Sequence, residues 1–433
     1  MMAYLPNIVF VIILSFGIGY FTRNIRKIIR NIKQGQPVDA SDQKKQRWNN
    51  VIRIALGQSK MVVRPIPGVL HLVVYLGFII INIEVLEIII DGIFGTHRIF
   101  SSLGGFYGFL IASFEVLAML VLVSVIVFWL RRNILKIQRF WKPEMKGWPK
   151  NDGNFILYFE MILMTLFLLM NATDVHFQEM NNGNIISKYI AGWFSNTSVG
   201  TLHIIERTAW WLHIVGILIF LNYLYFSKHL HIILAFPNVY FGSVKPKGQF
   251  TNLASVTNEV KLMLDPAADP YAAPSEGTET PAKFGASDVM DLTTTQLLNA
   301  YTCTECGRCT SECPANQTGK KLSPRKIMMD TRDRLEEVGK QLDKKGTFEP
   351  DGKQLLDDYI TREELWACTT CNACVEACPV SIDPLSIIMS MRQYLVMEQS
   401  AAPNELNITM TNIENNAAPW PFNQMDRANW INE

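Results

Sequence analysis

The chain has 433 residues, with 40 basic and 39 acidic side chains, so its formal net charge is only +1. A charge so close to zero argues against nucleic acid as a partner. The length is sufficient for two or three domains. The two halves differ in character, because long apolar runs fill the first half and all eight cysteines lie in the second.

Five apolar runs in the first half approach or exceed the roughly 20 residues that cross a bilayer as a helix. The first run has no basic segment before it and no small-residue cleavage site, so we interpret it as an uncleaved span rather than a signal peptide. We predict an all-α membrane domain over residues 1–237, with spans at Tyr4–Phe21, Ile66–Ile90, Gly105–Leu130, Phe155–Met170 and Trp210–Leu234.

The distribution of Lys and Arg predicts the orientation of this domain. The segment between spans one and two and the segment between spans three and four are both basic, from Arg23 to Arg64 and from Arg131 to Lys150. The other two loops are nearly free of positive charge. Since basic loops remain on the cytoplasmic side, we expect the N-terminus outside and the C-terminal half in the cytoplasm, which makes this a multi-pass protein of the bacterial inner membrane.

Two histidines are placed to bind a haem between helices. His71 lies about five residues inside the cytoplasmic start of span two, and His231 lies six residues before Pro237 near the cytoplasmic end of span five. Similar depth on the same side is the geometry of a bis-histidine b-type haem, and a histidine within a span is by default a functional candidate. The alternatives are a structural histidine bonded to a backbone carbonyl and, for His231, its neighbour His229.

A second haem would need further histidines toward the outer side. His213 precedes His231 by 18 residues, or five helical turns, so on a continuous helix the two share a face about 27 Å apart. Span two offers no histidine at that depth. His176, just past span four, is the preferred partner for His213, with His203 and His97 as weaker choices. The sequence leaves open whether one or two haems bind.

The cysteines form two runs of the same spacing in the second half. Each run has two-residue gaps between its first three cysteines, a three-residue gap before the fourth, and a proline after it. This spacing is typical of two [4Fe–4S] clusters in which the fourth cysteine of each run ligates the other cluster. Zinc knuckles and disulfides fit it less well. We assign Cys303, Cys306, Cys309 and Cys378 to one cluster, and Cys368, Cys371, Cys374 and Cys313 to the other.

The remaining segments follow from these assignments. We expect residues 238–297 to form a linker, because the part from Asp265 to Ala286 is rich in Pro, Ala, Thr and Gly. Residues 298–400 are expected to form a cytoplasmic, α-helical ferredoxin domain, with a helix starting at Leu322-Ser323-Pro324. The tail, residues 401–433, carries exposed aromatic residues and is expected to dock on a partner or to fold back on its own domain.

These motifs resemble known families. The five-span half resembles the gamma subunit of respiratory nitrate reductase, in which histidines of the second and fifth helices hold two b haems. His71, His213 and His231 match three of those ligands, whereas the fourth position is Ile81 here. The stretches Trp210–His213 and Ser227–His231, with Cys303–Thr310 and Leu322–Lys326, look more like heterodisulfide-reductase-related iron–sulfur proteins and electron-transfer-flavoprotein:menaquinone oxidoreductases.

The resemblance implies a membrane-anchored electron-transfer subunit of an oxidoreductase. Electrons would pass between a cytoplasmic partner and the quinone pool through the two clusters and haem b. The family's cysteine-rich CCG domain would belong to a separate subunit. An electron-transfer flavoprotein could supply that subunit with electrons. The alternatives are a redox-sensing or assembly module without turnover, and a path in which quinone meets the clusters without a haem.

Overall fold

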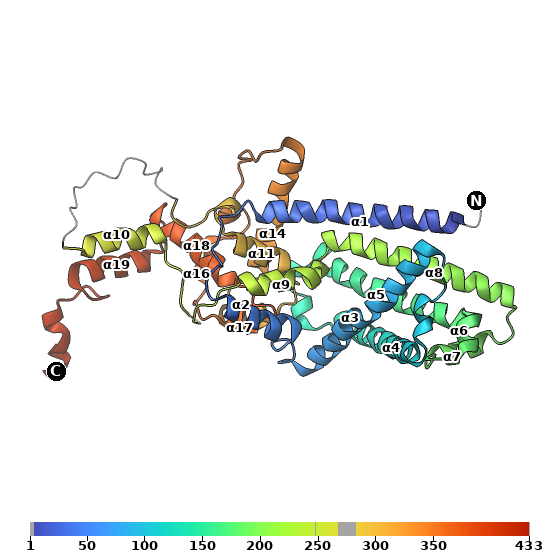
Figure 1. Ribbon diagram of the computed structural model, residues 1–433. Coiled ribbons are helices and arrows are strands. Elements are labelled where there is room, and N and C mark those ends of the chain that lie inside the picture. Colours follow the sequence, from blue (N-terminus) through green and yellow to red (C-terminus); the bar gives the residue numbers. More distant parts are fainter. Residues whose placement is uncertain (1–3, 247, 267–282, 433) are drawn as a thin grey trace.

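The computed structural model describes residues 4–246, 248–266 and 283–432, and within these ranges the chain forms helices and no strands (Figure 1). The only β-type contacts in the described ranges are isolated bridges, between Gln36 and Thr293 and between Leu356 and Ile360. An all-α fold with a membrane-type bundle and a helical second unit is therefore confirmed.

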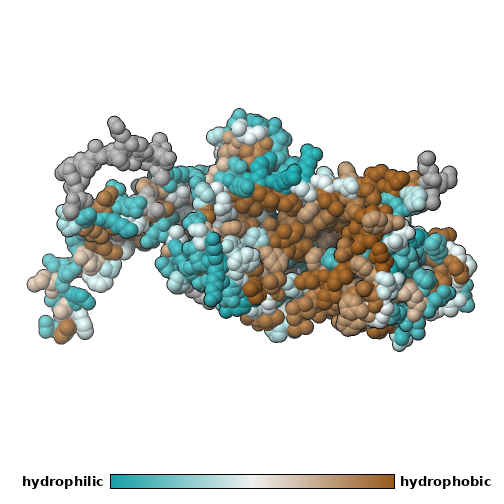
Figure 2. Space-filling view, viewed as in Figure 1, coloured by the Kyte–Doolittle hydropathy of each residue, from teal (hydrophilic) through white to brown (hydrophobic). Residues whose placement is uncertain are grey.

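Five helices are long and apolar enough to cross a membrane, as predicted. Proline in the first turn starts α1, α3 and α5, where a missing N–H costs no hydrogen bond. Figure 2 shows hydrophobic side chains gathered over these helices on the visible face. The helices are α1 (Leu5–Ile32), α3 (Pro65–Phe94), α4 (Gly105–Asn133), α5 (Trp148–Thr173) and α8 (Val199–Tyr223).

The bounds expected for the fifth span, Trp210–Leu234, are wrong, because the span covers Val199–Phe226. Helix α8 ends at Tyr223, two short 3-10 segments follow, and a new helix, α9 (His231–Phe241), begins at His231. Between the 3-10 segments Ser227 is extended, with φ −115° and ψ 144°, and its hydroxyl donates to the buried carboxylate of Asp152 at 2.7 Å. His213 and His231 are therefore not on one continuous helix, and the 27 Å separation derived from five turns does not apply.

The eight cysteines lie in a second helical unit at one end of the bundle. Helix α14 begins after Ser323, whose side chain accepts a hydrogen bond from the backbone N–H of Lys326, so the predicted helix start is confirmed. The helices of this unit are α11 (Thr294–Thr302), α12 (Arg308–Glu312), α13 (Pro314–Gln317), α14 (Pro324–Lys345), α15 (Leu355–Asp358), α16 (Arg362–Trp366), α17 (Ala373–Ala377) and α18 (Pro384–Met397).

The expected linker contains regular structure on both sides of residues 267–282, which lie outside the described ranges. Its first part carries the end of α9 and helix α10 (Ala254–Leu264). Its last part packs into the cysteine-bearing unit, because Ala286, Val289 and Leu292 are at most 1% exposed. The ordered unit therefore includes residues before position 298.

Long-range contacts fix this unit against the bundle. Helix α1 continues beyond the apolar run, and its last turn reaches α14 through Arg30 and Asp343, 2.6 Å apart. The side chain of Asn31 donates to the hydroxyl of Tyr301 at 3.1 Å. Helix α2 (Lys44–Asn50) presents Arg47 to the carbonyl oxygens of Tyr240 and Gly242.

The remaining helices lie at the two ends of the molecule. Short helices α6 (Val175–Met180) and α7 (Ser187–Ala191) connect α5 to α8 at the end opposite the cysteines (Figure 1). The tail forms α19 (Asn404–Asn416) and a 3-10 segment (Gln424–Asn432). Trp420, Phe422 and Trp430 are 45%, 65% and 72% exposed, which agrees with an aromatic tail that its own domain leaves uncovered.

Candidate redox centres

The two cysteine runs interleave in space. Cys303, Cys306, Cys309 and Cys378 line one pocket, together with Cys374. Cys313, Cys368, Cys371 and Cys374 line a second pocket. Each pocket thus contains the first three cysteines of one run and the fourth of the other, and Cys374 lies between the two pockets and lines both. This is the arrangement expected of two [4Fe–4S] clusters that exchange their fourth ligands.

The backbone of each run is bent in the same way. Gly307 and Asn372 adopt the left-handed conformation, with φ 71° and 60°, and each starts a short helix, α12 or α17. Helices α12 and α17 pack against each other. Glu305 and Thr370 also have positive φ, at 55° and 56°. Three non-glycine residues in this conformation are uncommon, and they turn the loops so that their thiols converge.

The chemistry of the thiols also fits iron. Burial raises the pKa of Cys303 and Cys374 to about 12 and that of Cys378 to about 11. A free thiolate is therefore unfavourable, and a bound cation would supply the charge that stabilises it. Backbone N–H groups of Thr370 and Ile382 point at Cys368 and Cys378 sulfurs, at 3.4 and 3.3 Å. Such hydrogen bonds set cluster potentials.

The two pockets differ in their exposure. Cys371, in the second pocket, is exposed. The loop of the first pocket instead contacts the membrane bundle, where Arg308 donates to the carbonyl oxygens of Lys60 and Met61 at 3.2 and 3.1 Å. The loop of the first pocket therefore faces the start of α3, and the second pocket has a cysteine open to solvent.

His71 and His231 lie together, as the sequence predicts. Their ring centroids are 6.5 Å apart, and two imidazoles that bind one metal from opposite sides at about 2 Å have centroids about 6 Å apart. The Nδ1 atom of His231 lies 3.2 Å from the carbonyl oxygen of Lys228, which leaves Nε2 for a metal. Nδ1 of His71 is buried without a hydrogen-bond partner. This donor set fits a b haem.

His229 has other neighbours. Its Nε2 lies 4.0 Å from a carboxylate oxygen of Glu160, and its ring packs on Phe220 at 5.3 Å. The His231 ring lies 5.4 Å from it. Of the two adjacent histidines, His231 is the one whose ring contacts His71.

His213 and His176 have different surroundings. His213 is 1% exposed, its ring packs on Phe167 at 5.9 Å, and its Nδ1 is buried without a hydrogen-bond partner. The ring of His176 lies 5.6 Å from that of His97. The ring of His176 thus contacts His97 and not His213, so the ring contacts do not join the two histidines that the sequence pairs for a second haem.

Lys228 connects the histidine pair to the first cysteine pocket, and sequence reasoning missed it. Its ammonium forms ion pairs with Glu305, between Cys303 and Cys306, and with Asp152 at 3.7 Å. Burial alone raises the pKa of Glu305, but its pairing with Lys228 and Arg332 outweighs that effect and lowers it. The stretch Ser227–His231 carries a family resemblance in the sequence, but no local pattern shows where its lysine points.

The comparisons with known proteins agree with an iron–sulfur oxidoreductase. Residues 302–382 match the family described as 4Fe-4S dicluster domain. The chain is 28% identical over 98% of its length to the "Probable iron-sulfur-binding oxidoreductase FadF" of Bacillus subtilis, covering 61% of that protein. It is 26% identical over 88% of its length to the "EtfAB:quinone oxidoreductase" of Syntrophomonas wolfei, covering 53%.

A shorter relative matches part of the chain. One subunit of the ferredoxin/F(420)H(2)-dependent CoB-CoM heterodisulfide reductase of Methanosarcina acetivorans is 30% identical over 27% of this chain and 60% of its own length. The chain spans only about half to three-fifths of the length of the two relatives named first. No solved structure is significantly similar to it.

Proposed function

We propose that this protein is the membrane-anchored electron-transfer subunit of a quinone-linked oxidoreductase, passing electrons between a cytoplasmic partner and membrane quinone through two [4Fe–4S] clusters and one b haem. The observation that carries the proposal is the contact between the two kinds of site. The loop of His231 and the loop of Cys303 are joined through Lys228 and Glu305. The clusters and the haem carry single electrons, and the protein positions them.

The order of sites follows from burial. Cys371 makes the second pocket accessible from solvent, which suits contact with a soluble redox partner. The first pocket lies between it and the histidine pair, because Arg308 and Glu305 in its loop both contact the membrane bundle. The histidine pair is at the bundle end nearest the cysteines, where membrane quinone can approach within the bilayer.

The partner is proposed from the relatives. One of them is an EtfAB:quinone oxidoreductase and another belongs to a heterodisulfide reductase. A cysteine-rich CCG-type subunit, fed by an electron-transfer flavoprotein, would suit the exposed second pocket, and the aromatic tail after residue 401 offers an apolar docking surface.

The proposed membrane orientation has the cysteine-bearing unit in the cytoplasm and the N-terminus outside. The basic segments that predict this orientation both lie at the bundle end that contacts the cysteine-bearing unit, through Arg30, Lys60 and Lys142. A reducing compartment would also keep the eight cysteines available for iron.

The test is an optical titration of the purified protein with a quinol. We expect a Soret band typical of a b haem that a menaquinol analogue reduces and the matching quinone reoxidises. His71→Ala should lose this band, whereas His203→Ala, which changes an exposed histidine on α8, should keep it. A wild-type haem that does not respond to quinol, or an unchanged band in His71→Ala, would refute the proposed path.

A further inference from the structure

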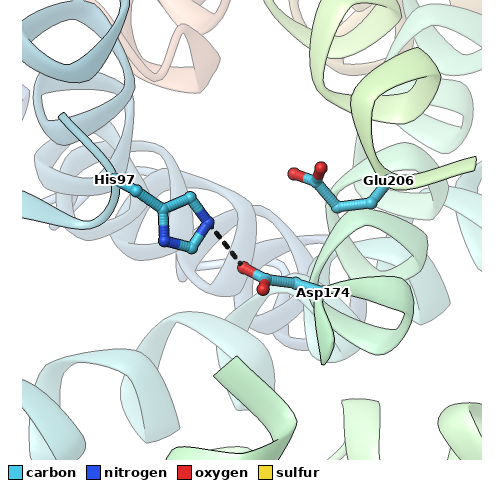
Figure 3. Close-up of side chains that lie close together, drawn as sticks. All are labelled: His97, Asp174 and Glu206. Carbon is cyan, nitrogen blue, oxygen red and sulfur yellow. Dashed lines mark ion pairs between the residues drawn. The ribbon is translucent and has the colours of Figure 1, made fainter. Parts of the chain in front are cut away.

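A polar cavity lies at the end of the bundle opposite the cysteines. It has a volume of about 310 Å³ and is formed by the ends of α1, α3, α5 and α8 with the loop after α3. Phe10, Trp210 and Trp211 form an apolar wall. Figure 3 shows that His97, Asp174 and Glu206, from three different segments, point toward a common space.

These three side chains have the types and distances of metal ligands. One ligand atom from each lies within 4.8 Å of the others, and His97 Nε2 is 3.2 Å from an Asp174 oxygen. Ligands bound at about 2.0–2.2 Å to zinc lie somewhat more than 3 Å from one another. Closing the group around a metal therefore needs a small adjustment, mainly of the His97 side chain, which is 42% exposed.

Both carboxylates are held by groups outside the ligand set. Asp174 accepts a hydrogen bond from Arg98 Nε at 2.9 Å and from the backbone N–H of Phe177 at 3.1 Å. Glu206 pairs with Arg207 through two guanidinium nitrogens. Outer partners of this kind fix ligating carboxylates in metal sites.

The cavity also has an excess of negative charge and an unpaired oxygen. Its lining includes five carboxylate side chains and two arginines. Glu87 and Asp91 accept hydrogen bonds from neighbouring backbone N–H groups. Glu84 is 2% exposed, its Oε1 is 3.7 Å from Arg98, and its Oε2 has no hydrogen-bond partner. A buried, unpaired carboxylate oxygen is unfavourable, and a cation in the cavity would lower that cost.

We propose that this cavity binds one divalent transition-metal ion of the zinc class, with His97, Asp174 and Glu206 as ligands, water in the fourth position, and Glu84 supplying nearby negative charge. An imidazole with carboxylates suits zinc, whereas calcium and magnesium prefer oxygen ligands alone. The ion would tie the loop after α3 to the start of α6 and to α8. This site is independent of the electron path proposed above.

The experiment uses the full-length protein in detergent, freed of loosely bound metal with a chelator and dialysed. Zinc binding is measured by titration calorimetry and by elemental analysis, with calcium as the comparison ion. We expect one zinc per chain in addition to the iron, and no comparable binding of calcium. His97→Ala and Glu206→Gln should each weaken zinc binding at least about tenfold, the scale on which changes around a metal act.

His203→Ala is the matched control, because it removes an exposed histidine from the helix that carries Glu206. It should bind zinc as the wild type does, and far-UV circular dichroism of every variant reports whether the helices are intact. If the His97→Ala protein fails to fold, the zinc affinity of Glu206→Gln tests the proposal by itself. This change keeps the shape of the side chain and removes only its charge, so the protein should still fold. Wild-type protein without stoichiometric zinc, or Glu206→Gln with unchanged affinity, would overturn the assignment.

Discussion

Lys228 lies between α5, the loop that joins α11 to α12, and the start of α9, and its ammonium group pairs with two carboxylates. Its ammonium faces Glu305 and Asp152, and its carbonyl oxygen faces His231 Nδ1. Glu305 also pairs with Arg332 at 2.7 Å. Removing one partner of a buried pair is costly because the other charge remains buried. Arg332 limits this cost.

We expect Lys228→Met to lower the free energy of unfolding by about 3 kcal/mol, the lower end of the range for a broken buried pair. Lys228→Arg keeps the charge and should lose less. Thermal unfolding followed by haem absorbance and by far-UV circular dichroism measures the difference. A Lys228→Met protein as stable as wild type would show that the network contributes no stability.

The exchange of the fourth cysteines can be tested by a pair of variants. Cys378→Ser should perturb the cluster held by Cys303, Cys306 and Cys309, whereas Cys313→Ser should perturb the cluster in the exposed pocket. Each change should cause loss or altered composition of one of the two clusters and leave the other unchanged. Electron paramagnetic resonance of the reduced proteins distinguishes them, since the two variants serve as controls for each other. Identical residual spectra would contradict the assignment.

At the scale of elements, hydropathy and spacing located most helices but not the break before His231. Apolar residues resume after the short polar stretch Ser227–His229, and there is no Gly or Pro between Tyr223 and Pro237 to mark a helix end. The helix ends because Tyr223 and Ser227 both donate to Asp152, 71 and 75 residues away in the chain. Such a tertiary contact is invisible in a window of sequence. The same limit hid Lys228, whereas the cysteine spacing and the pairing of His71 with His231 could be predicted.

The junction between α1 and α14 offers a test at this scale. A Cβ atom added at Gly339 would lie 2.3 Å from Asn31 Nδ2. We therefore expect Gly339→Val to push the two helices apart and weaken the Arg30–Asp343 pair. Hydrogen exchange of the last turn of α1 should increase severalfold. Gly200→Ala, where nothing lies within 4 Å, is the control, and unchanged exchange in Gly339→Val would contradict the packing.

At the scale of the whole molecule, the candidate sites are distributed along the length of the helix bundle. The cysteine-bearing helices lie at one end of a five-helix bundle, and α6 and α7 lie at the other end (Figure 1). The histidine pair lies where the two units meet, and the carboxylate-rich cavity is formed at the end opposite the cysteines. We expect a reporter enzyme fused after residue 433 to be active only in the cytoplasm, because of the basic loops. Activity on the outer side would reverse the proposed orientation.

The central claim is that the histidine pair connects the cysteine sites to quinone. The most direct measurement is reoxidation of the dithionite-reduced clusters by a menaquinone analogue after excess reductant is removed, followed by electron paramagnetic resonance. In wild-type protein the quinone should reoxidise both clusters within the dead time of manual mixing. In His71→Ala the clusters should assemble and be reduced, yet remain reduced when quinone is added. Equally fast reoxidation in both proteins would contradict the account.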